Sequence, residues 1–122
     1  MSDKTTSIEE LKDIIAKIIE EREWSKFHTP SNIAKSIIIE SAELLEKFQW
    51  ADGQKSKEIL EDEKADIEDE VADIFSYLLS LCHHYNIDLS NSFKNKMEKN
   101  RKKYPIDQCK GKSDKYTKYL KD

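Results

Sequence analysis

Two short acidic pairs carry the clearest chemical signal in the sequence: Glu40-x-x-Glu43 and Glu70-x-x-Asp73. Residues three apart on a helix lie about 60° apart around its axis, so each pair projects from one helical face. If the two faces meet, the carboxylates repel one another unless a cation compensates their charge. Oxygen ligands of this kind suit Mg²⁺, and a water activated at such a site is a natural nucleophile for phosphoryl chemistry.

Each acidic pair also has a purely structural interpretation. Acidic side chains are common on exposed helix surfaces, and Glu43 precedes Lys47 by four residues, the spacing of a surface ion pair. Either pair alone therefore favours a solvated surface. Two pairs on successive predicted helices, both bordering apolar stripes, give the metal site and the solvated surface equal weight.

Helices are the elements that must position these acids. Charged residues make up 38% of the 122 residues, and only two Gly and two Pro occur, which leaves little turn chemistry for a sheet. The fold class expected is all-α: a four-helix bundle core with a short basic C-terminal tail. Residues 1–105 are expected to form a helical catalytic domain, and residues 106–122 a lysine-rich tail or lid.

Four segments show apolar residues at helical spacing. Ser7 and Glu10 form a capping box at the start of the first. Gly53 is expected to stop the second in a left-handed conformation. The predicted ranges are about 7–24, 31–50 and 62–84, with a fourth helix from the turn at 86–90 to residue 103.

The charge distribution limits the class of partner. The formal net charge is −4, which argues against a nucleic-acid-coating surface. Acidic residues concentrate from Glu40 to Asp73 and lysines from Lys94 to Lys121. An acidic centre could bind cations and a basic end an anion, and solvated faces explain both equally well.

Compartment is inferred from features that the sequence does not contain. The first residues hold no apolar signal region, and no run approaches membrane-spanning length. Cys82 and Cys109 form neither a disulfide framework nor a zinc motif. We expect a reduced, cytoplasmic protein with no nucleic-acid or membrane partner.

Further motifs surround the acidic pairs in a definite order. They are Glu23-Trp24-x-x-Phe27-His28-x-Pro30-x-Asn32, Phe48-Gln49-Trp50, Asp73-Ile-Phe-Ser-Tyr77, Lys96-Met97-x-x-Asn100-Arg101-x-x-Tyr104-Pro105 and Gly111-Lys-Ser-Asp-Lys115-Tyr116-Thr117. This ordered set, which spans nearly the whole chain, resembles the MazG-like all-alpha nucleoside triphosphate pyrophosphohydrolases, in particular their dCTP pyrophosphatase branch.

The resemblance implies a reaction in which water attacks the α-phosphate of a nucleoside triphosphate and pyrophosphate leaves, so that a monophosphate remains. It implies a house-cleaning enzyme with a preference for dCTP or modified dCTP, assembled as a homodimer or homotetramer. The cofactor would be Mg²⁺, or Mn²⁺ in its place. The residues expected to hold the metal and to carry the catalysis, at least one by orienting or deprotonating the water, are Glu40, Glu43, Glu70 and Asp73.

The same motifs supply candidate substrate ligands. Trp24 and Trp50 could stack on a nucleobase, although either tryptophan could be an ordinary core or interface aromatic. The Tyr77 hydroxyl could reach a phosphate or sugar, or only water. His28 could bind substrate or fix its own loop.

Basic and amide side chains near the C-terminus complete this set. Lys96, Asn100 and Arg101 share a helical stretch and could contact phosphates, sugar or base. Exposed lysines are nevertheless the default on any helix. The tail residues Lys112, Lys115 and Tyr116 could close over the triphosphate, or belong to a disordered, solubilising tail.

One position departs from the branch that the motifs resemble. The dCTP-specific animal members carry a histidine in the base pocket at the position that matches Ile15 of this chain. The same reaction with broader or different base selectivity, on dUTP or non-canonical nucleotides, therefore stays open. A non-enzymatic helical oligomerisation module is a third hypothesis, since Ile38, Ile39 and Leu45 exceed what one apolar stripe needs.

Overall fold

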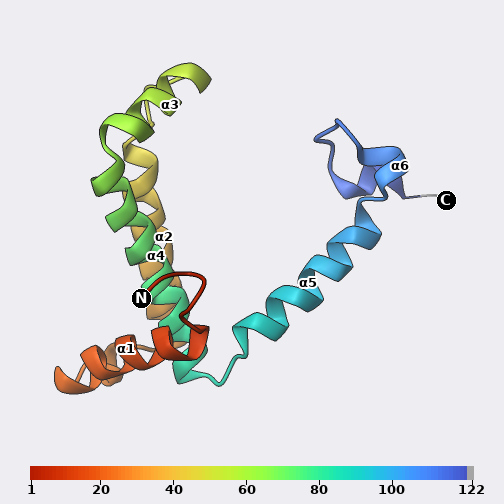
Figure 1. Ribbon diagram of the computed structural model, residues 1–122. Helices are drawn as coiled ribbons and strands as arrows, with labels where there is room; N and C mark the ends of the chain where they lie inside the picture. The colour runs from red at the N-terminus through yellow and green to blue at the C-terminus, as the bar shows by residue number, and fades with distance from the viewer. Residues whose placement is uncertain (121–122) are drawn as a thin grey trace. The chain divides into compact units, whose positions relative to one another are not determined.

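The computed structural model describes residues 1–120, and every regular element in that range is helical (Figure 1). The all-α prediction is confirmed. In chain order the elements are α1 (Ile8–Glu21), the 3₁₀ helix η1 (Ser25–Phe27), α2 (Pro30–Glu46), α3 (Gly53–Asp62), α4 (Lys64–His84), α5 (Leu89–Lys103), α6 (Ile106–Cys109) and the 3₁₀ helix η2 (Tyr116–Tyr119).

Contacts divide the chain into two units, Met1–Ile87 and Asp88–Asp122, and the last two residues of the second unit lie outside the described part. Each unit is described by itself. The division at residue 105 into a catalytic domain and a tail stays a prediction. Within residues 1–120, no helix combines the length and the apolar character needed to cross a bilayer.

Side-chain caps set the starts of α1 and α2. The Ser7 hydroxyl accepts from the Glu10 N–H at 3.1 Å, and the Glu10 carboxylate accepts from the Ser7 N–H at 2.7 Å, which is the predicted capping box. Thr29 caps α2 by accepting from the Asn32 N–H at 3.2 Å, with Pro30 in the first turn. Side-chain hydrogen bonds therefore fix the starts of α1 and of α2, which carries Glu40 and Glu43, whereas α4, which carries Glu70 and Asp73, has no side-chain cap.

The segment after α2 differs from the prediction. Gly53 does not stop a helix in a left-handed conformation; it is the first residue of α3, and Asp52 caps that helix by accepting from the Lys55 N–H at 2.9 Å. The glycine with positive φ is Gly111, at 80°. The sequence prediction missed α3 because its only large apolar side chains, Ile59 and Leu60, are too few to show a helical period.

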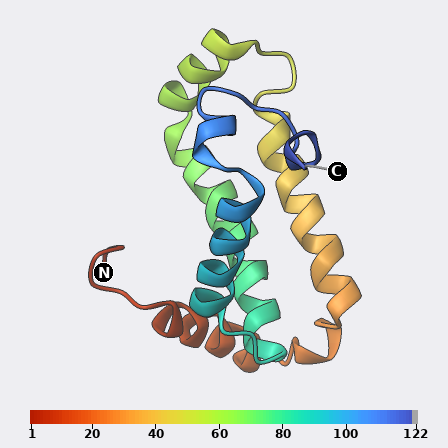
Figure 2. The ribbon, with the colours of Figure 1, turned by 90° about the vertical axis from the view of Figure 1, so that its right-hand side faces the viewer.

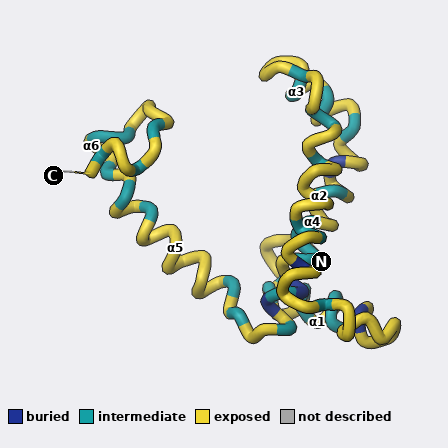
Figure 3. Tube along the Cα trace, turned by 180° about the vertical axis from the view of Figure 1, so that it is seen from behind, coloured by how far each residue is buried: buried dark blue, intermediate teal, exposed yellow. Residues whose placement is uncertain are grey.

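The first unit is built on α2 and α4, which run side by side in opposite directions, with α1 packed against α4 near one end (Figures 1 and 2). The buried side chains gather mainly where α1 meets the other two helices (Figure 3). They are Ile19, Ile33, Leu79, Ser80 and Cys82, with Ile67 buried separately near the start of α4. This core fixes the register of α2 against α4.

The second unit contains α5 and a folded C-terminal segment. Asp88 caps α5 by accepting from the Asn91 N–H at 2.9 Å. The Tyr104 ring packs edge-on against Tyr116 and Tyr119, with ring centroids 6.4 and 6.3 Å apart, and the Lys103 ammonium lies 4.6 Å from the Tyr116 centroid. Through residue 120, the predicted tail therefore includes short helical turns packed on the end of α5.

Candidate active site

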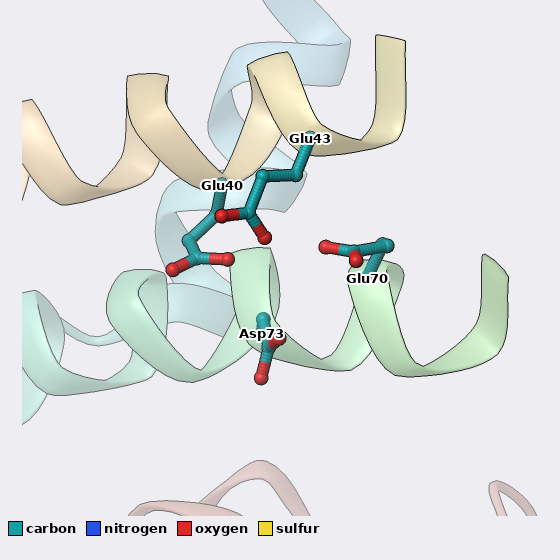
Figure 4. A group of neighbouring side chains, drawn as sticks. All are labelled: Glu40, Glu43, Glu70 and Asp73. Atoms are coloured by element: carbon teal, nitrogen blue, oxygen red, sulfur yellow. The ribbon is translucent and has the colours of Figure 1, made fainter. Parts of the chain in front are cut away.

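The acidic pairs meet across the α2–α4 contact. Glu40 and Glu43 extend from α2 toward α4, which carries Glu70 and Asp73 (Figure 4). One carboxylate oxygen from each of the four residues lies within 4.8 Å of the others. Glu40 and Glu70 are partly buried, whereas Glu43 and Asp73 are exposed. The structure thus brings together all four residues that the spacing singled out.

The charge of this cluster is poorly compensated. Glu40 Oε2 and Glu70 Oε2 are buried and have no hydrogen-bond partner within the described chain. Burial raises the pKa of the Glu40 carboxyl, and the charges of Glu43, Asp73 and Glu70 raise it further. Burial also raises the pKa of Glu70, with Glu43 and Asp73 adding to the effect and the Lys47 ammonium opposing it.

The surface ion pair considered for Glu43 is absent, because Lys47 pairs elsewhere. Its ammonium lies 3.2 Å from Glu63 Oε1 and 3.6 Å from Asp66 Oδ2, at the start of α4. Both partners come from the helix that packs beside Lys47, so tertiary contact replaces the local i, i+4 pair. Of the ion pairs found in residues 1–120, none includes a member of the acidic cluster.

These features test whether a metal fits. A hard divalent cation prefers carboxylate oxygens, and here two such oxygens are buried without partners while the exposed pair stays open to solvent. An unpaired buried carboxylate is costly, and a cation removes that cost. The donor set therefore fits a divalent metal such as Mg²⁺.

A pocket of about 190 Å³ adjoins the acidic cluster. One wall is apolar and comes from Ile15, Ile18 and Ile19 of α1. The other side carries polar and aromatic groups from the α1–α2 connection, α2 and α4: Trp24, His28, Glu40, Asp73, Ser76, Tyr77 and Ser80. Three predicted substrate residues, Trp24, His28 and Tyr77, thus line the same pocket as two of the acids.

The end of α1 positions Trp24. Glu23 takes a left-handed conformation with φ of 55°, and the Trp24 N–H donates to Ile19 O at 3.0 Å. Five residues later the Thr29 cap begins α2, so His28 lies in a short connection held at both ends. The Asn32 side chain adds a hydrogen bond to Phe27 O at 3.0 Å.

Other predicted substrate residues lie elsewhere. Trp50 follows α2 and is 92% exposed. Lys96, Asn100 and Arg101 lie on α5, in the second unit. Lys112 and Lys115 are exposed and Tyr116 is partly buried in the C-terminal segment. Roles for these residues in binding substrate stay predictions.

The structure adds residues that the sequence reasoning left out. Ser76 and Ser80 line the pocket, and His84 Nε2 lies 3.3 Å from His28 Nδ1. Their positions share a signal, because 73, 76, 77, 80 and 84 fall on one face of α4 at helical spacing. The link to His28 has no local signal, since 56 residues separate the two histidines.

Comparison with known proteins assigns the family. The MazG-like family matches residues 35–118, a range that contains both acidic pairs. The chain belongs to the MazG-like family. This agrees with the resemblance drawn from the ordered motifs.

Individual relatives are consistent with this assignment. The chain is 32% identical over 113 residues to dCTP pyrophosphatase 1 of Rattus norvegicus and 33% identical over 113 residues to that of Homo sapiens, matches that cover 91% of this chain and 66% of each relative. The chain thus spans 66% of the length of these curated relatives. A solved pyrophosphatase from Archaeoglobus fulgidus is 45% identical, with a TM-score of 0.79, over 86% of this chain and 98% of that one.

The charge cluster predicts a pH dependence of stability. Because the folded-state pKa values of Glu40 and Glu70 lie above their ordinary 4.5, protonation of these groups favours the folded state. That contribution is lost as the pH rises from about 4.5 through the raised folded values. Without divalent metal, Glu70→Gln should therefore raise the melting temperature at pH 7.5 and change it less at pH 5.

The same cluster predicts stabilisation by metal. Mg²⁺ at about ten times its Kd should raise the melting temperature of the wild-type protein by several degrees and leave the melting temperature of Glu70→Gln unchanged.

Differential scanning calorimetry measures both effects. Glu68→Gln is the matched control, because Glu68 is exposed on the same helix and lies outside the cluster. It should behave as wild type in both respects. A lower metal-free melting temperature for Glu70→Gln at pH 7.5, or a Mg²⁺ response that survives this substitution, would contradict the account.

Proposed function

We propose that the chain is a Mg²⁺-dependent nucleoside triphosphate pyrophosphohydrolase, which converts a deoxynucleoside triphosphate and water into a monophosphate and pyrophosphate. The observation that carries the proposal is the cluster of four carboxylates whose oxygens lie within 4.8 Å of one another. Membership of the MazG-like family and the names of the relatives, dCTP pyrophosphatase 1 and pyrophosphatase, support it.

Glu40, Glu43, Glu70 and Asp73 would hold the metal, which is Mg²⁺ or, in its place, Mn²⁺. The bound ion would polarise phosphate oxygens and lower the pKa of a coordinated water. The protein itself contributes the positions of the acids, fixed by the packing of α2 against α4. A carboxylate oxygen of the cluster would accept the proton of the attacking water, and Glu40 Oε2 and Glu70 Oε2 have no hydrogen-bond partner that competes for this role.

The pocket beside the cluster would take the nucleoside. Its isoleucine wall and the Trp24 ring offer apolar surfaces to the faces of a base, while the Tyr77 hydroxyl can donate to a sugar or phosphate oxygen. Exposed Trp50 supplies a second stacking surface. Further substrate ligands are proposed from the motifs alone: Lys96, Asn100, Arg101, Lys112, Lys115 and Tyr116.

The preferred substrate is proposed to be dCTP or a modified dCTP, in a house-cleaning role, because the relatives are named for dCTP. A second candidate is the same reaction on dUTP or non-canonical nucleotides. Ile15 favours it, since this side chain lines the pocket and cannot hydrogen-bond to a base edge. In both cases the metal chemistry is the same and only the base contacts differ.

Turnover is predicted to depend on the acidic cluster. Purified protein with Mg²⁺ should release pyrophosphate from dCTP or a 5-substituted dCTP faster than from the other nucleotides of a canonical and modified panel. Glu70→Gln should lower kcat at least a hundredfold, because it removes one ligand charge from the site that stabilises the reacting phosphate. A coupled pyrophosphate assay and separation of the nucleotide products measure both quantities.

The control and the contrary outcomes separate the alternatives. Glu68→Gln should keep wild-type kcat. Fast turnover of dUTP or a purine nucleotide in place of dCTP would support the proposed pyrophosphohydrolase reaction and contradict the proposed preference for cytosine. If the folded protein cleaves no nucleotide, the hypothesis that it is an enzyme is rejected and the hypothesis of a helical oligomerisation module is favoured.

The protein is also proposed to form a homodimer or homotetramer. Ile38, Ile39 and Leu45 of α2 are 70%, 58% and 65% exposed, an apolar surface that a second copy could cover. Size-exclusion chromatography with light scattering should give two or four copies of the 14.3 kDa chain. Ile38→Glu should shift the population toward smaller species, whereas Lys17→Glu, a charge change at an exposed position of α1, should not. A monomer at micromolar concentration would contradict the proposal.

A further inference from the structure

His28, which lines the pocket, is tied to the end of α4 by two contacts. His28 Nδ1 lies 3.3 Å from His84 Nε2, and the Tyr85 hydroxyl donates to His28 O at 2.9 Å. The two imidazole rings meet edge to face, with centroids 5.3 Å apart and planes at 78°. His84, the last residue of α4, thus contacts the side chain of His28, and Tyr85, the C-cap of that helix, contacts its backbone.

Two ring nitrogens 3.3 Å apart share one hydrogen, so one ring must donate and the other accept. Burial lowers the pKa of His84, and the charges of His28 and His83 lower it further. His84 is therefore neutral at pH 7 and carries one ring hydrogen. Other titratable groups adjoin the pair or line the pocket: exposed His83 and Tyr85 at the end of α4, and Glu40, Asp73 and Tyr77 in the pocket lining, to which α1 contributes only isoleucines.

The tautomer of His84 decides what His28 offers to a ligand. If His84 donates from Nε2, His28 accepts at Nδ1 and must carry its own hydrogen on Nε2. The pocket favours this arrangement, because Glu40 and Asp73 present only acceptor oxygens to it. Nucleotide phosphates, and the carbonyl groups of pyrimidine bases, are acceptors as well.

We propose that His84 is a positioning residue, which holds the His28 ring so that its Nε2–H serves as a hydrogen-bond donor to the bound nucleotide. The inference rests on the proposed function, because it assigns the ligand as a nucleotide. His84 acts through His28 and does not itself line the pocket. Tyr85 completes the arrangement by fixing the backbone from which the His28 ring extends.

Imidazole nitrogen NMR tests the pairing without substrate or metal. The chain contains three histidines, His28, His83 and His84, so the ring spectrum is small enough to assign by single substitutions. In wild type at pH 8, His28 should be the Nε2–H tautomer. His84→Gln should preserve this state, because the glutamine amide nitrogen takes the place of imidazole Nε2 and donates the same hydrogen. His84→Ala should convert His28 to a mixture of tautomers.

Two further variants serve as controls. His83→Gln changes the exposed neighbour of His84 and should leave the His28 spectrum as in wild type. In His84→Asn the amide nitrogen takes the place of Nδ1 and falls short of His28, so this variant should behave like alanine. Because asparagine keeps a polar group at the site, it provides the comparison if the alanine variant does not fold.

Kinetics then test the role in binding. His84→Ala and His84→Asn should raise KM for the nucleotide about five- to tenfold with kcat within twofold, the effect of one lost or misaligned hydrogen bond. His84→Gln should keep both constants within twofold of wild type. A His28 tautomer unchanged in His84→Ala and His84→Asn, or an unchanged KM in both, would overturn the inference while leaving the proposed function intact. A protein that shows the NMR contrast but neither binds nor cleaves any nucleotide would overturn the proposed function and the donor role together, while the His28–His84 pair itself would stand.

Discussion

Repulsion among four carboxylates is the physical constraint on which the arrangement of the site depends. The partly buried carboxyls of Glu40 and Glu70 cannot leave the cluster unless α2 and α4 separate, because each extends from a helix that is packed against the other. Moving the helices apart would expose the core side chains between them. The charges are therefore held close, and the raised pKa values of Glu40 and Glu70 follow from that confinement.

Two anchors hold the helices together on either side of this repulsion. Toward the start of α2 and the end of α4, Ile33 and Leu79 are buried with Ile19 of α1. Toward the other end, Lys47 bridges from α2 to Glu63 and Asp66 near the start of α4. The acidic cluster lies between the apolar anchor and the ionic one. Because Lys47 forms its ion pairs with Glu63 and Asp66, no ion pair neutralises the negative charge of the cluster, which can attract a cation. This arrangement lowers the stability of the metal-free fold and favours metal binding.

The apolar anchor also forms one wall of the pocket beside the acidic cluster. Ile19 belongs both to the buried core and to the pocket lining, and its neighbours Ile15 and Ile18 continue the wall. The opposite side comes from the polar face of α4, with Tyr77 one turn and Ser80 two turns beyond Asp73. The proposed metal ligands and the proposed nucleoside surface are thus parts of the same packed helices, which would hold a base at a fixed position relative to the reacting phosphate.

Much of this could be predicted from local sequence patterns, and the remainder depends on tertiary contacts. The spacing of Glu40-x-x-Glu43 and Glu70-x-x-Asp73 places each pair on one face, and the apolar period gives the helices that carry them. Helix α3 was missed because its two large apolar residues, Ile59 and Leu60, are too few to show a helical spacing. In addition, the dipeptide Asp52-Gly53 can begin a helix as well as end one. The Lys47 bridge and the His28–His84 contact were missed because their partners are distant in sequence. No rule of spacing connects residues 16 or 56 positions apart.

The most direct test of the central claim is calorimetric titration of the metal-free protein with Mn²⁺ near pH 6, repeated in two buffers of different ionisation enthalpy. If the cluster holds a divalent cation against its own repulsion, binding should be saturable and should release protons, because the metal displaces them from carboxyls whose pKa is raised. The proton release should fall toward zero above pH 8, and Glu70→Gln should abolish the binding. Saturable binding that survives Glu70→Gln, or no binding at millimolar Mn²⁺ by a folded protein, would show that the four carboxylates do not form the metal site.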